Sequence, residues 1–369
     1  MLYNPEDIGN TKMLSGILHC SEDIILRLQF PVVLCQPPTH NRDSNIVVIH
    51  RIPKRRVHNE YRVVYNVYFE EYSNAYKCLK YYLYDLYSPH RAIHGFIPTR
   101  NIASNAQQHI TKKNITNIDI KDFFGSISIE KVKSTFIRYN FIDDVADILS
   151  KIVTLNERLV AGYATSPIIA NMYCDLMDNE IQEICDSNDV TYTRYADDIT
   201  LSGDKIDILE QVKSILSKYG FEINDRKTRL YHKGQGQYVT GLSVEDCLMP
   251  RIPKYIKRKI QQEIYYISKY GIRSVLAFKS TSKDKYLEDK LEYEVEFDEV
   301  DIKSKAAKII GWIAYAQSIE PEFALKCKKQ LLKTKHNESI KCLCLAQGFI
   351  DEKSGIRINL DKVFIDDKL

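Results

Sequence analysis

Two adjacent aspartates, Asp197 and Asp198, stand in the middle of the segment "TYTRYADDITLSG" (191–203), between two runs of apolar and β-branched residues. The runs on both sides predict two β-strands joined by a hairpin that carries the acids at its tip. Neighbouring carboxylates repel one another unless a cation lies between them or water screens them. The hairpin therefore carries either a solvated turn, in which Asp is common, or a divalent-metal site.

A third carboxylate, Asp119, ends the strand-like run "NID" in the segment "NIDIKDFFGSI" (117–127). Phosphoryl transfer with two magnesium ions needs carboxylates that bridge cations about 3.5–4 Å apart. Magnesium is bound through a few carboxylates, with waters and substrate phosphates completing its shell. The chain has no glycine-rich loop of the GxGxxG or Walker type, so nucleotide chemistry would depend on such a metal site. Asp119, Asp197 and Asp198 supply the set, with Mn²⁺ as an alternative ion.

The segments around these acids predict an α+β fold with an antiparallel sheet backed by helices. In 164–184, Ser166 stands at an expected N-cap, Pro167 follows at the first helical position, and apolar residues recur at helical spacing. A second amphipathic helix is expected to end at Gly220, and strands are expected around "FEI" and "TRLYH". The order strand, helix, helix, hairpin, helix, strand favours this layout over a parallel βαβ array.

Composition points to an ordinary soluble globular protein that we expect in the cytoplasm. Apolar residues make up 44% and charged residues 27% of the chain, which are common values for that class. No apolar run is long enough to cross a membrane, and the first residues do not resemble a secretory signal. Nine cysteines without CxxC pairs suggest reduced thiols.

Charge is segregated along the chain, although the net charge is only +3. Basic clusters lie at 50–58, 250–259 and 326–336, and an acidic run occupies 286–301. Each basic cluster fits either a groove that follows a nucleic-acid backbone or a solvated helix face.

Four segments resemble, in order, the A, B, C and D motifs of reverse transcriptases. They read "NIDIKDFFGSI", "AGYATSPIIANM", "YTRYADDITLS" and "GFEINDRKTRL", and the resemblance spans roughly residues 45–345. "NAQQH" (105–109) and "VTG" (239–241) further resemble signatures of bacterial retron reverse transcriptases. The signature residues are Asn105, His109, Val239, Thr240 and Gly241.

The resemblance implies a right-hand polymerase fold with fingers, palm and a helical thumb. The expected parts are an N-terminal extension (1–45), fingers with parts of the palm (46–114 and 129–165), palm (115–128 and 166–249), thumb (250–345, with an acidic insertion near 284–302) and a C-terminal tail (346–369). The insertion is expected to face solvent or a protein partner, and we assign no function to the tail.

The implied function is an RNA-directed DNA polymerase that binds a cognate structured non-coding RNA and primes from the 2′-OH of a guanosine in it. Its product from dNTPs would be a branched RNA–DNA molecule, msDNA. No acidic RNase H constellation follows, so a host RNase H would remove the template. Retrons act in anti-phage defence, which implies an effector protein as partner. The alternatives are another bacterial reverse transcriptase, or an RNA-binding scaffold with the palm fold and a vestigial activity.

Motif positions imply roles for single residues. Asp119 and Asp197 are the expected metal ligands, assisted by Asp198. Lys227 is a general acid on the leaving pyrophosphate, a plain positive charge on it, or a surface lysine.

Other positions belong to the expected nucleotide pocket. Arg62 would clamp the triphosphate, and Asp122 lies either near it or on the surface. One of Phe123 and Phe124 must be a core residue, and the motif register makes Phe124 the steric gate that excludes a 2′-OH.

The remaining expectations concern residues of motif B, His109 and the thumb. Gly162 and Ser166 of motif B would line the nucleotide pocket, but Val160 and Ala161 replace the usual Pro and Gln, which bears on fidelity and rate. His109 is expected to form structural hydrogen bonds. The expected RNA-binding residues of the thumb are Lys254, Lys257, Arg258 and Lys259.

Overall fold

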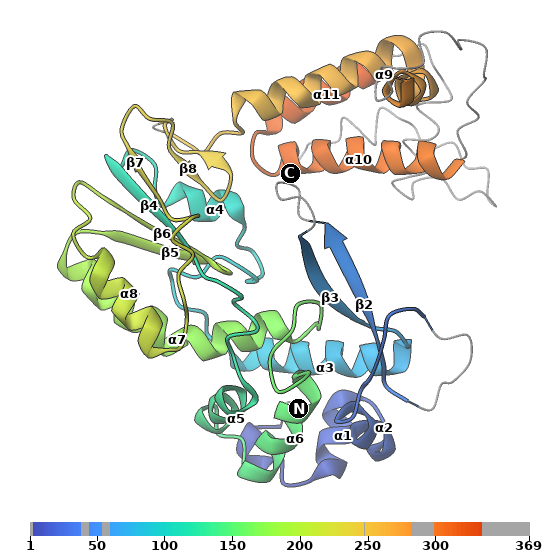
Figure 1. The fold of residues 1–369 in the computed structure, drawn as a ribbon, viewed down its shortest axis with the longest axis vertical. Coiled ribbons are helices and arrows are strands. Elements are labelled where there is room, and N and C mark those ends of the chain that lie inside the picture. Colours follow the sequence, from blue (N-terminus) through green and yellow to red (C-terminus); the bar gives the residue numbers. More distant parts are fainter. Residues whose placement is uncertain (1–2, 38–43, 54–59, 247, 282–298, 334–369) are drawn as a thin grey trace. The chain divides into compact units, whose positions relative to one another are not determined.

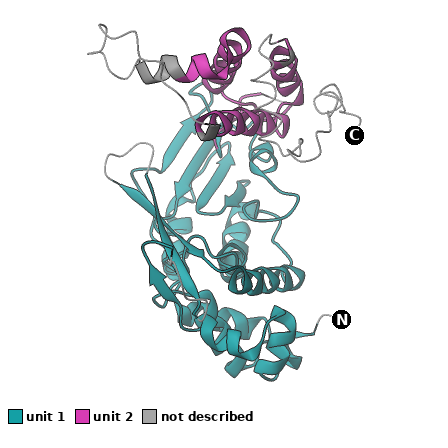
Figure 2. Ribbon diagram, turned by 90° about the vertical axis from the view of Figure 1, so that its right-hand side faces the viewer, with its two compact units in different colours: residues 1–240 teal, residues 241–369 magenta. Residues whose placement is uncertain are grey.

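The computed structural model describes residues 3–37, 44–53, 60–246, 248–281 and 299–333. Most of the acidic insertion and the whole C-terminal tail lie outside these residues. The chain forms two compact units, Met1–Thr240 and Gly241–Leu369 (Figure 2). The boundary lies within the "VTG" signature, and the finer subdivision into fingers and palm stays a prediction.

The first unit begins with short helices and a three-stranded sheet. The turn η1 (Pro5–Asp7) and helices α1 (Thr11–Leu18) and α2 (Glu22–Leu28) precede strands β1 (Val32–Leu34), β2 (Ile46–Pro53) and β3 (Tyr61–Val67), in the order β1-β2-β3. Strands β2 and β3 are antiparallel, and Ile52 pairs with Arg62. The first three residues of β2 are buried, whereas the end that carries this pair is exposed.

A four-stranded antiparallel sheet forms the other half of this unit, with the order β5-β6-β4-β7. Its strands are β4 (Asn114–Asp119), β5 (Thr191–Tyr195), β6 (Asp198–Gly203) and β7 (Arg229–His232) (Figure 1). The predicted hairpin and antiparallel sheet are confirmed. The strand predicted at "FEI" is wrong, since only Ile223 forms an isolated bridge, to Ile120.

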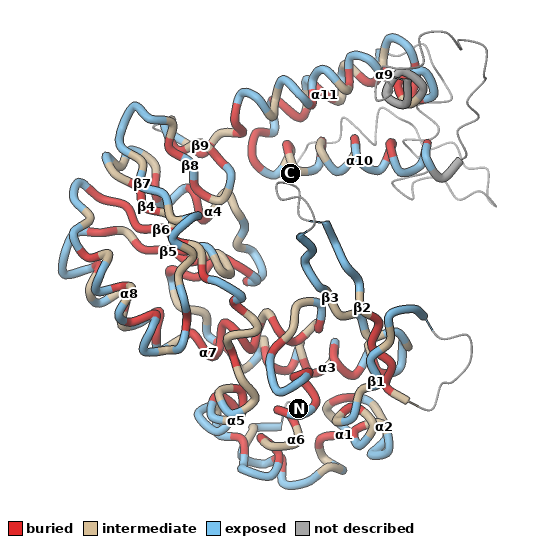
Figure 3. The backbone as a smooth tube through the Cα atoms, in the orientation of Figure 1, coloured by how far each residue is buried: buried red, intermediate tan, exposed pale blue. Residues whose placement is uncertain are grey.

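Six further helices belong to this unit. They are α3 (Glu70–Leu86), α4 (Ile102–Gln107), α5 (Ile129–Arg138), α6 (Asp143–Val153), α7 (Ser166–Ser187) and α8 (Leu209–Lys218). Helix α7 packs against β5 and α8, and Figure 3 shows burial along much of its length. Gly220 has φ +77° just after α8, which confirms the predicted stop.

The start of α7 differs from the expectation. Ser166 is the first helical residue and not the N-cap, which is Thr165. The Ser166 N–H donates to the Tyr163 carbonyl at 3.3 Å, so a preceding turn leads into the helix without a side-chain cap. The Ser166 side chain is buried.

The second unit is helical in its described part, as predicted for the basic region. After β9 (Leu242–Ser243) come α9 (Lys254–Thr281), α10 (Glu299–Gln317) and α11 (Pro321–Leu332), which pack on one another. Ile260, Ile264 and Ile267 recur at helical spacing and are buried. None of the described helices combines the length and the apolar character needed to span a membrane.

Candidate active site

The strand register brings the three predicted acids to one end of the four-stranded sheet. Asp119, the last residue of β4, pairs directly with Asp198, the first residue of β6. Residues opposite each other on antiparallel strands project to the same face. Asp197 lies in the two-residue turn between β5 and β6, and its carbonyl accepts a hydrogen bond from the Ile120 N–H at 3.0 Å.

Burial and mutual repulsion raise the pKa of two of these carboxyl groups. Burial, with the charges of Asp197 and Asp119 adding to it, raises the pKa of Asp198 to about 6. Burial also raises the pKa of Asp197, where the Asp119 charge acts in the same direction and the nearby Lys227 and Arg62 oppose it. Partly desolvated carboxylates that repel one another in this way form a donor set that a divalent cation would stabilise.

The third carboxylate, Asp119, already has a cationic partner. The Lys227 ammonium donates to its Oδ1 and Oδ2 atoms at 2.8 and 2.9 Å, and the Asn224 amide donates to Oδ2 at 3.2 Å. Among the residues that the structure describes, no three His, Cys, Asp or Glu side chains are grouped to hold an ion as they stand. The lysine supplies the positive charge at Asp119. Sequence reasoning missed Asn224, whose only signal is its place three residues before Lys227.

The two phenylalanines of motif A differ in burial, as expected if one is a core residue and the other is the steric gate. Phe123 is buried and stacks on Phe221, with ring centroids 5.6 Å apart, whereas Phe124 is only half-buried. The Phe124 ring contacts the Phe96 ring at 6.1 Å. Phe123 is thus the core residue, and the role of Phe124 as steric gate stays a prediction.

Asp122 lies in the turn just before these rings, with an exposed side chain and φ +40°. A Cβ atom on Gly125 would lie 2.2 Å from the Asp122 Oδ2 atom. The carboxylate therefore packs against its own turn, and a role near the triphosphate stays a prediction.

The loop of motif B is attached to β3 through backbone atoms. The Tyr65 N–H donates to the Ala161 carbonyl at 2.8 Å. Gly162 has φ +113°, and a Cβ atom there would lie 2.1 Å from the Tyr65 carbonyl oxygen. This attachment uses the backbone at position 161, so it does not need the usual Gln side chain. Arg62, on the same strand, is exposed but close enough to lower the pKa of Asp197.

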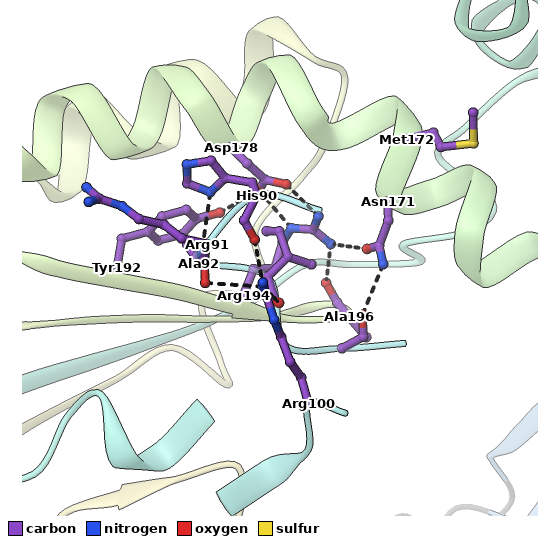
Figure 4. A network of polar contacts seen from close by, with 12 residues as sticks. His90, Arg91, Ala92, Arg100, Asn171, Met172, Asp178, Tyr192, Arg194 and Ala196 are labelled. Atoms are coloured by element: carbon purple, nitrogen blue, oxygen red, sulfur yellow. Dashed lines mark hydrogen bonds and ion pairs between the residues drawn. The ribbon is translucent and has the colours of Figure 1, made fainter. Parts of the chain in front are cut away.

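A buried polar network that the sequence did not reveal lies beneath the hairpin (Figure 4). Arg194 on β5 donates from Nε and Nη2 to the two carboxylate oxygens of Asp178 on α7, at 2.8 and 2.6 Å. Its Nη1 atom donates to Asn171 Oδ1 at 3.1 Å and to the Ala196 carbonyl in the turn at 3.3 Å. The Tyr192 hydroxyl donates to Asp178 at 2.6 Å. The only signal in the sequence is the presence of charged residues on otherwise apolar faces of a strand and a helix.

Val239 and Thr240 of the second retron signature lie close to helix α4, which carries part of the first signature. His109 is buried, and each ring nitrogen lies 2.7 Å from a hydroxyl oxygen, of Ser202 and Thr193. Burial, with some repulsion from His94 and Lys112, lowers the pKa of His109 to about 3. The ring is therefore neutral and joins β5 to β6 through hydrogen bonds, as expected for a structural histidine.

The remaining signature residues are Asn105 on α4 and the residues 239–241 at the unit boundary. The Thr240 hydroxyl donates to the Ile102 carbonyl at 3.1 Å, and Val239 is buried. Gly241 has φ +81°. Asn105 is buried, and neither atom of its amide has a hydrogen-bond partner among the described residues.

The four predicted RNA-binding residues of the second unit differ in their surroundings. Lys254, Arg258 and Lys259 are exposed on α9. Lys257 is instead half-buried, and its ammonium donates to the Glu320 carboxylate at 2.6 Å. The Glu320 carboxylate also accepts the Ile252 N–H at 2.7 Å. Lys257 therefore stabilises packing inside the unit, and the other three residues are available to a ligand.

Comparison with known proteins finds similarity to reverse transcriptases. A family model described as "Reverse transcriptase (RNA-dependent DNA polymerase)" matches residues 52–287. The retron Mx65 reverse transcriptase of Myxococcus xanthus is 30% identical over an alignment of 213 residues, with 50% of this chain and 50% of that one covered. The retron Ec83 reverse transcriptase of Escherichia coli is 24% identical over 323 residues, covering 82% of this chain and 90% of that one.

Solved structures also match. Apo telomerase from Candida tropicalis is 13% identical, with a TM-score of 0.43 over 85% of this chain and 64% of that one. Alignments to several of the curated relatives span about half of the relative's length.

Proposed function

The chain belongs to the reverse transcriptase family, and on that premise we propose that it is a retron-type RNA-directed DNA polymerase. The observation that carries the proposal is the pairing of Asp119 with Asp198 across β4 and β6, with Asp197 in the adjacent turn. This arrangement supplies the carboxylates that the family uses at its catalytic centre. The names of the curated relatives support the retron type.

Asp119 and Asp197, with Asp198 beside them, would hold two Mg²⁺ ions or, alternatively, Mn²⁺. When bound, the ions supply charge neutralisation at the attacking hydroxyl and at the leaving pyrophosphate. Lys227 is held at this site by its ion pair with Asp119. This ion pair supports the proposal that the Lys227 charge stabilises the pyrophosphate oxygens.

Residues on three other segments would select and hold the incoming dNTP. The guanidinium of Arg62 on β3 presents a fork of donors that suits phosphate oxygens. The half-buried ring of Phe124 would lie under the sugar and exclude a 2′-OH. Gly162 keeps the motif B loop against β3 because a side chain there would collide with Tyr65. Ser166 begins α7 directly after this loop.

RNA binding is proposed for the exposed face of α9. Between Lys254 and Leu276, the exposed side chains of this helix include several Lys, Arg and Tyr residues and no Asp or Glu. Positive charges contact RNA phosphates, and A-form stems are recognised mainly by shape and by 2′-OH groups. The proposed ligand is a stem of the cognate structured non-coding RNA.

The retron type further implies a specific product and biological setting. The enzyme would prime from the 2′-OH of a guanosine in the bound RNA and make branched RNA–DNA from dNTPs. A host RNase H would remove the copied template. The protein with its RNA–DNA product would then act in anti-phage defence, together with an effector protein.

Primer extension on an RNA template tests the polymerase proposal. Wild-type protein is expected to incorporate dNTPs with Mg²⁺ and to stop when EDTA is added. Asp197→Asn should lower kcat by at least about 10²-fold, because one anionic ligand becomes a neutral amide. The matched control Asp207→Asn, an exposed acid outside the site, should behave as wild type. Extension by Asp197→Asn at the wild-type rate would contradict the assignment of the site.

Sequencing of the nucleic acid that co-purifies with the protein from a host carrying its native locus tests the retron type. The expected result is a short DNA joined by a 2′–5′ branch to one structured RNA, absent from the variant with Asp197→Asn and Asp198→Asn. DNA without a branch would indicate another bacterial reverse transcriptase. Bound RNA without DNA in both samples would favour the scaffold with vestigial activity.

A further inference from the structure

An open groove of about 650 Å³ lies in the first unit between α3, the segment 96–98 and the start of α7. Its volume is in the range of small-ligand sites, about 300–1,000 Å³. Much of its lining is aromatic or cyclic, and the residues that matter here are Lys80, Tyr81, Tyr84, Asp85, Phe96 and Pro167. None of the roles proposed above uses this groove.

Phe96 connects the groove to the candidate active site. Its ring contacts the ring of Phe124, the expected steric gate, with centroids 6.1 Å apart. The residue before it, Gly95, packs on the catalytic hairpin so closely that a Cβ atom would lie 2.3 Å from the Ala196 nitrogen. Through Phe96, the groove therefore adjoins the expected steric gate.

The backbone holds Phe96 in a conformation that a bulky residue rarely adopts. Its φ is +62°, which costs free energy and is common at ligand-binding sites. The Tyr84 hydroxyl donates to the Phe96 carbonyl at 2.6 Å, and Asn171 on α7 donates to the Gly95 carbonyl at 3.0 Å. These bonds fix a ring that stays 36% exposed.

Tyr81 provides a second aromatic surface with a positive charge beside it. Its ring is 62% exposed, and the Lys80 ammonium lies 4.4 Å from the ring centroid. Exposed aromatic faces next to cations are the surfaces on which proteins stack unpaired bases while a basic group contacts the phosphate. The Asp85 carboxylate in the same lining can accept a hydrogen bond from an exocyclic amino group of a base.

We propose that this groove stacks the unpaired template base next to the one being copied. The inference rests on the proposed polymerase function and deepens it by locating part of the RNA template. A base is favoured over a second triphosphate because the described lining offers one lysine beside aromatic faces, whereas triphosphates need several cations. The stacking site would keep the template single-stranded and ordered before each nucleotide is copied.

The test uses two RNA templates that differ at one position. In one, the nucleotide immediately 5′ of the templating base carries its base; in the other, that nucleotide is abasic. Single-nucleotide incorporation is measured with wild-type protein and with Tyr81→Ala, Phe96→Leu and the control Tyr3→Ala, which alters an exposed tyrosine outside the lining. Phe96→Leu keeps an apolar side chain, so the core beside Phe124 is preserved while the aromatic face is lost.

Wild-type protein should distinguish the two templates by their KM values, and the two groove variants should lose this distinction. The abasic template should raise the wild-type template KM by about 5- to 150-fold, the range that base stacking on aromatic residues supplies. In Tyr81→Ala and Phe96→Leu the ratio of the two KM values should fall towards one, while Tyr3→Ala keeps the wild-type ratio. The dNTP KM should show no such dependence on the abasic position.

Two results would overturn the inference. One is a wild-type KM that is the same for both templates, and the other is a wild-type ratio that persists in both groove variants. Should the wild-type protein incorporate nothing on either template, the polymerase proposal fails. Fluorescence anisotropy of the same two RNA templates then decides the groove separately: equal affinity of wild-type protein for both would reject it.

Discussion

Arg194 and Asp178 form a bidentate ion pair that is fully buried beneath the hairpin carrying Asp197 and Asp198 (Figure 4). The pair joins β5 to α7, and a further hydrogen bond from Arg194 reaches the Ala196 carbonyl in the turn itself. Arg194 is therefore a positioning residue. It links the turn that carries Asp197 to helix α7, which begins within motif B.

Neutralising one member of this pair is expected to be costly. Asp178→Asn leaves the Arg194 guanidinium buried without a counter-charge, which should lower the free energy of unfolding by about 3–5 kcal/mol. Urea denaturation followed by circular dichroism measures this change. The control Asp186→Asn breaks the exposed Arg91–Asp186 pair and should cost less than about 1 kcal/mol. Equal losses in the two variants would show that the buried pair does not have this role.

Lys227 is expected to act through its charge, because it already binds a carboxylate at the site. Lys227→Arg keeps a cation that can bind phosphate oxygens but does not release a proton near neutral pH. We expect this variant to keep kcat within about tenfold of wild type, and Lys227→Met to lose about 10²-fold or more. Single-turnover incorporation measures both rates. If the Arg variant is as slow as the Met variant, proton donation is the role of Lys227.

Truncation of Phe123 is expected to lower the stability of the fold, whereas truncation of Phe124 is expected to change the selection between dNTPs and rNTPs. Phe124→Ala removes the half-buried ring and should raise the kcat/KM for rNTPs relative to dNTPs. Phe123→Ala leaves a cavity beside Phe221 and should destabilise the fold by about 3–5 kcal/mol without relaxing sugar selection. Paired measurements of incorporation and of the midpoint of thermal unfolding separate the two. Relaxed selection in Phe123→Ala alone would reverse the assignment.

Gly162 should not tolerate any side chain. A methyl group at this position collides with the Tyr65 carbonyl, so Gly162→Ala must separate the motif B loop from β3, and we expect a raised KM for dNTPs. Gly234→Ala is the matched control, because Gly234 also has positive φ but no atom lies within 4 Å of its added Cβ. The control pays only the backbone strain of about 1–2 kcal/mol. Equal dNTP KM values in the two variants would contradict this account.

The features that could be predicted from the sequence are those whose signals come from residues close together in the chain. The hairpin around Asp197, the helical spacing after Pro167 and the stop at Gly220 depend on neighbours within one or two turns, and all three are present in the structure. The Asp119 position relative to the hairpin came from motif order, and the strand register then explains it. These features share a short-range pattern that a single sequence displays directly.

The failures concern partners that are distant in the chain. The sequence places Arg194 in a strand but does not show that its counter-charge is Asp178 on another element. In the same way, nothing local relates Asn224 to Asp119. The segment "FEI" reads as a strand because a charged residue stands between two apolar ones, but only Ile223 forms a bridge, to Ile120. Ser166 was predicted as a cap from its type, whereas the preceding turn already supplies the helix start.

His109 gives a pH dependence whose sign follows from its burial. Its pKa of about 3 in the fold lies below the ordinary value near 6.5, so the unfolded chain binds more protons between these values. The contribution of this group to stability is therefore complete above about pH 6.5. It falls as the pH drops, by up to about 1.4 kcal/mol per pH unit. The raised pKa values of Asp197 and Asp198 act in the opposite direction, so the slope of wild type alone does not isolate His109.

The contribution of His109 can be isolated by comparing variants in how steeply the free energy of unfolding changes with pH. His109→Gln removes the titrating ring, and its free energy of unfolding should fall less steeply than that of wild type between pH 6.5 and pH 4.5. His19→Asn removes an exposed histidine with positive φ, a conformation that Asn tolerates, and should keep the wild-type slope. Urea titrations at several pH values measure all three slopes. A slope of His109→Gln equal to that of wild type would show that the His109 ring can be protonated in the folded protein, and the two short contacts to Ser202 and Thr193 would then need a charged ring.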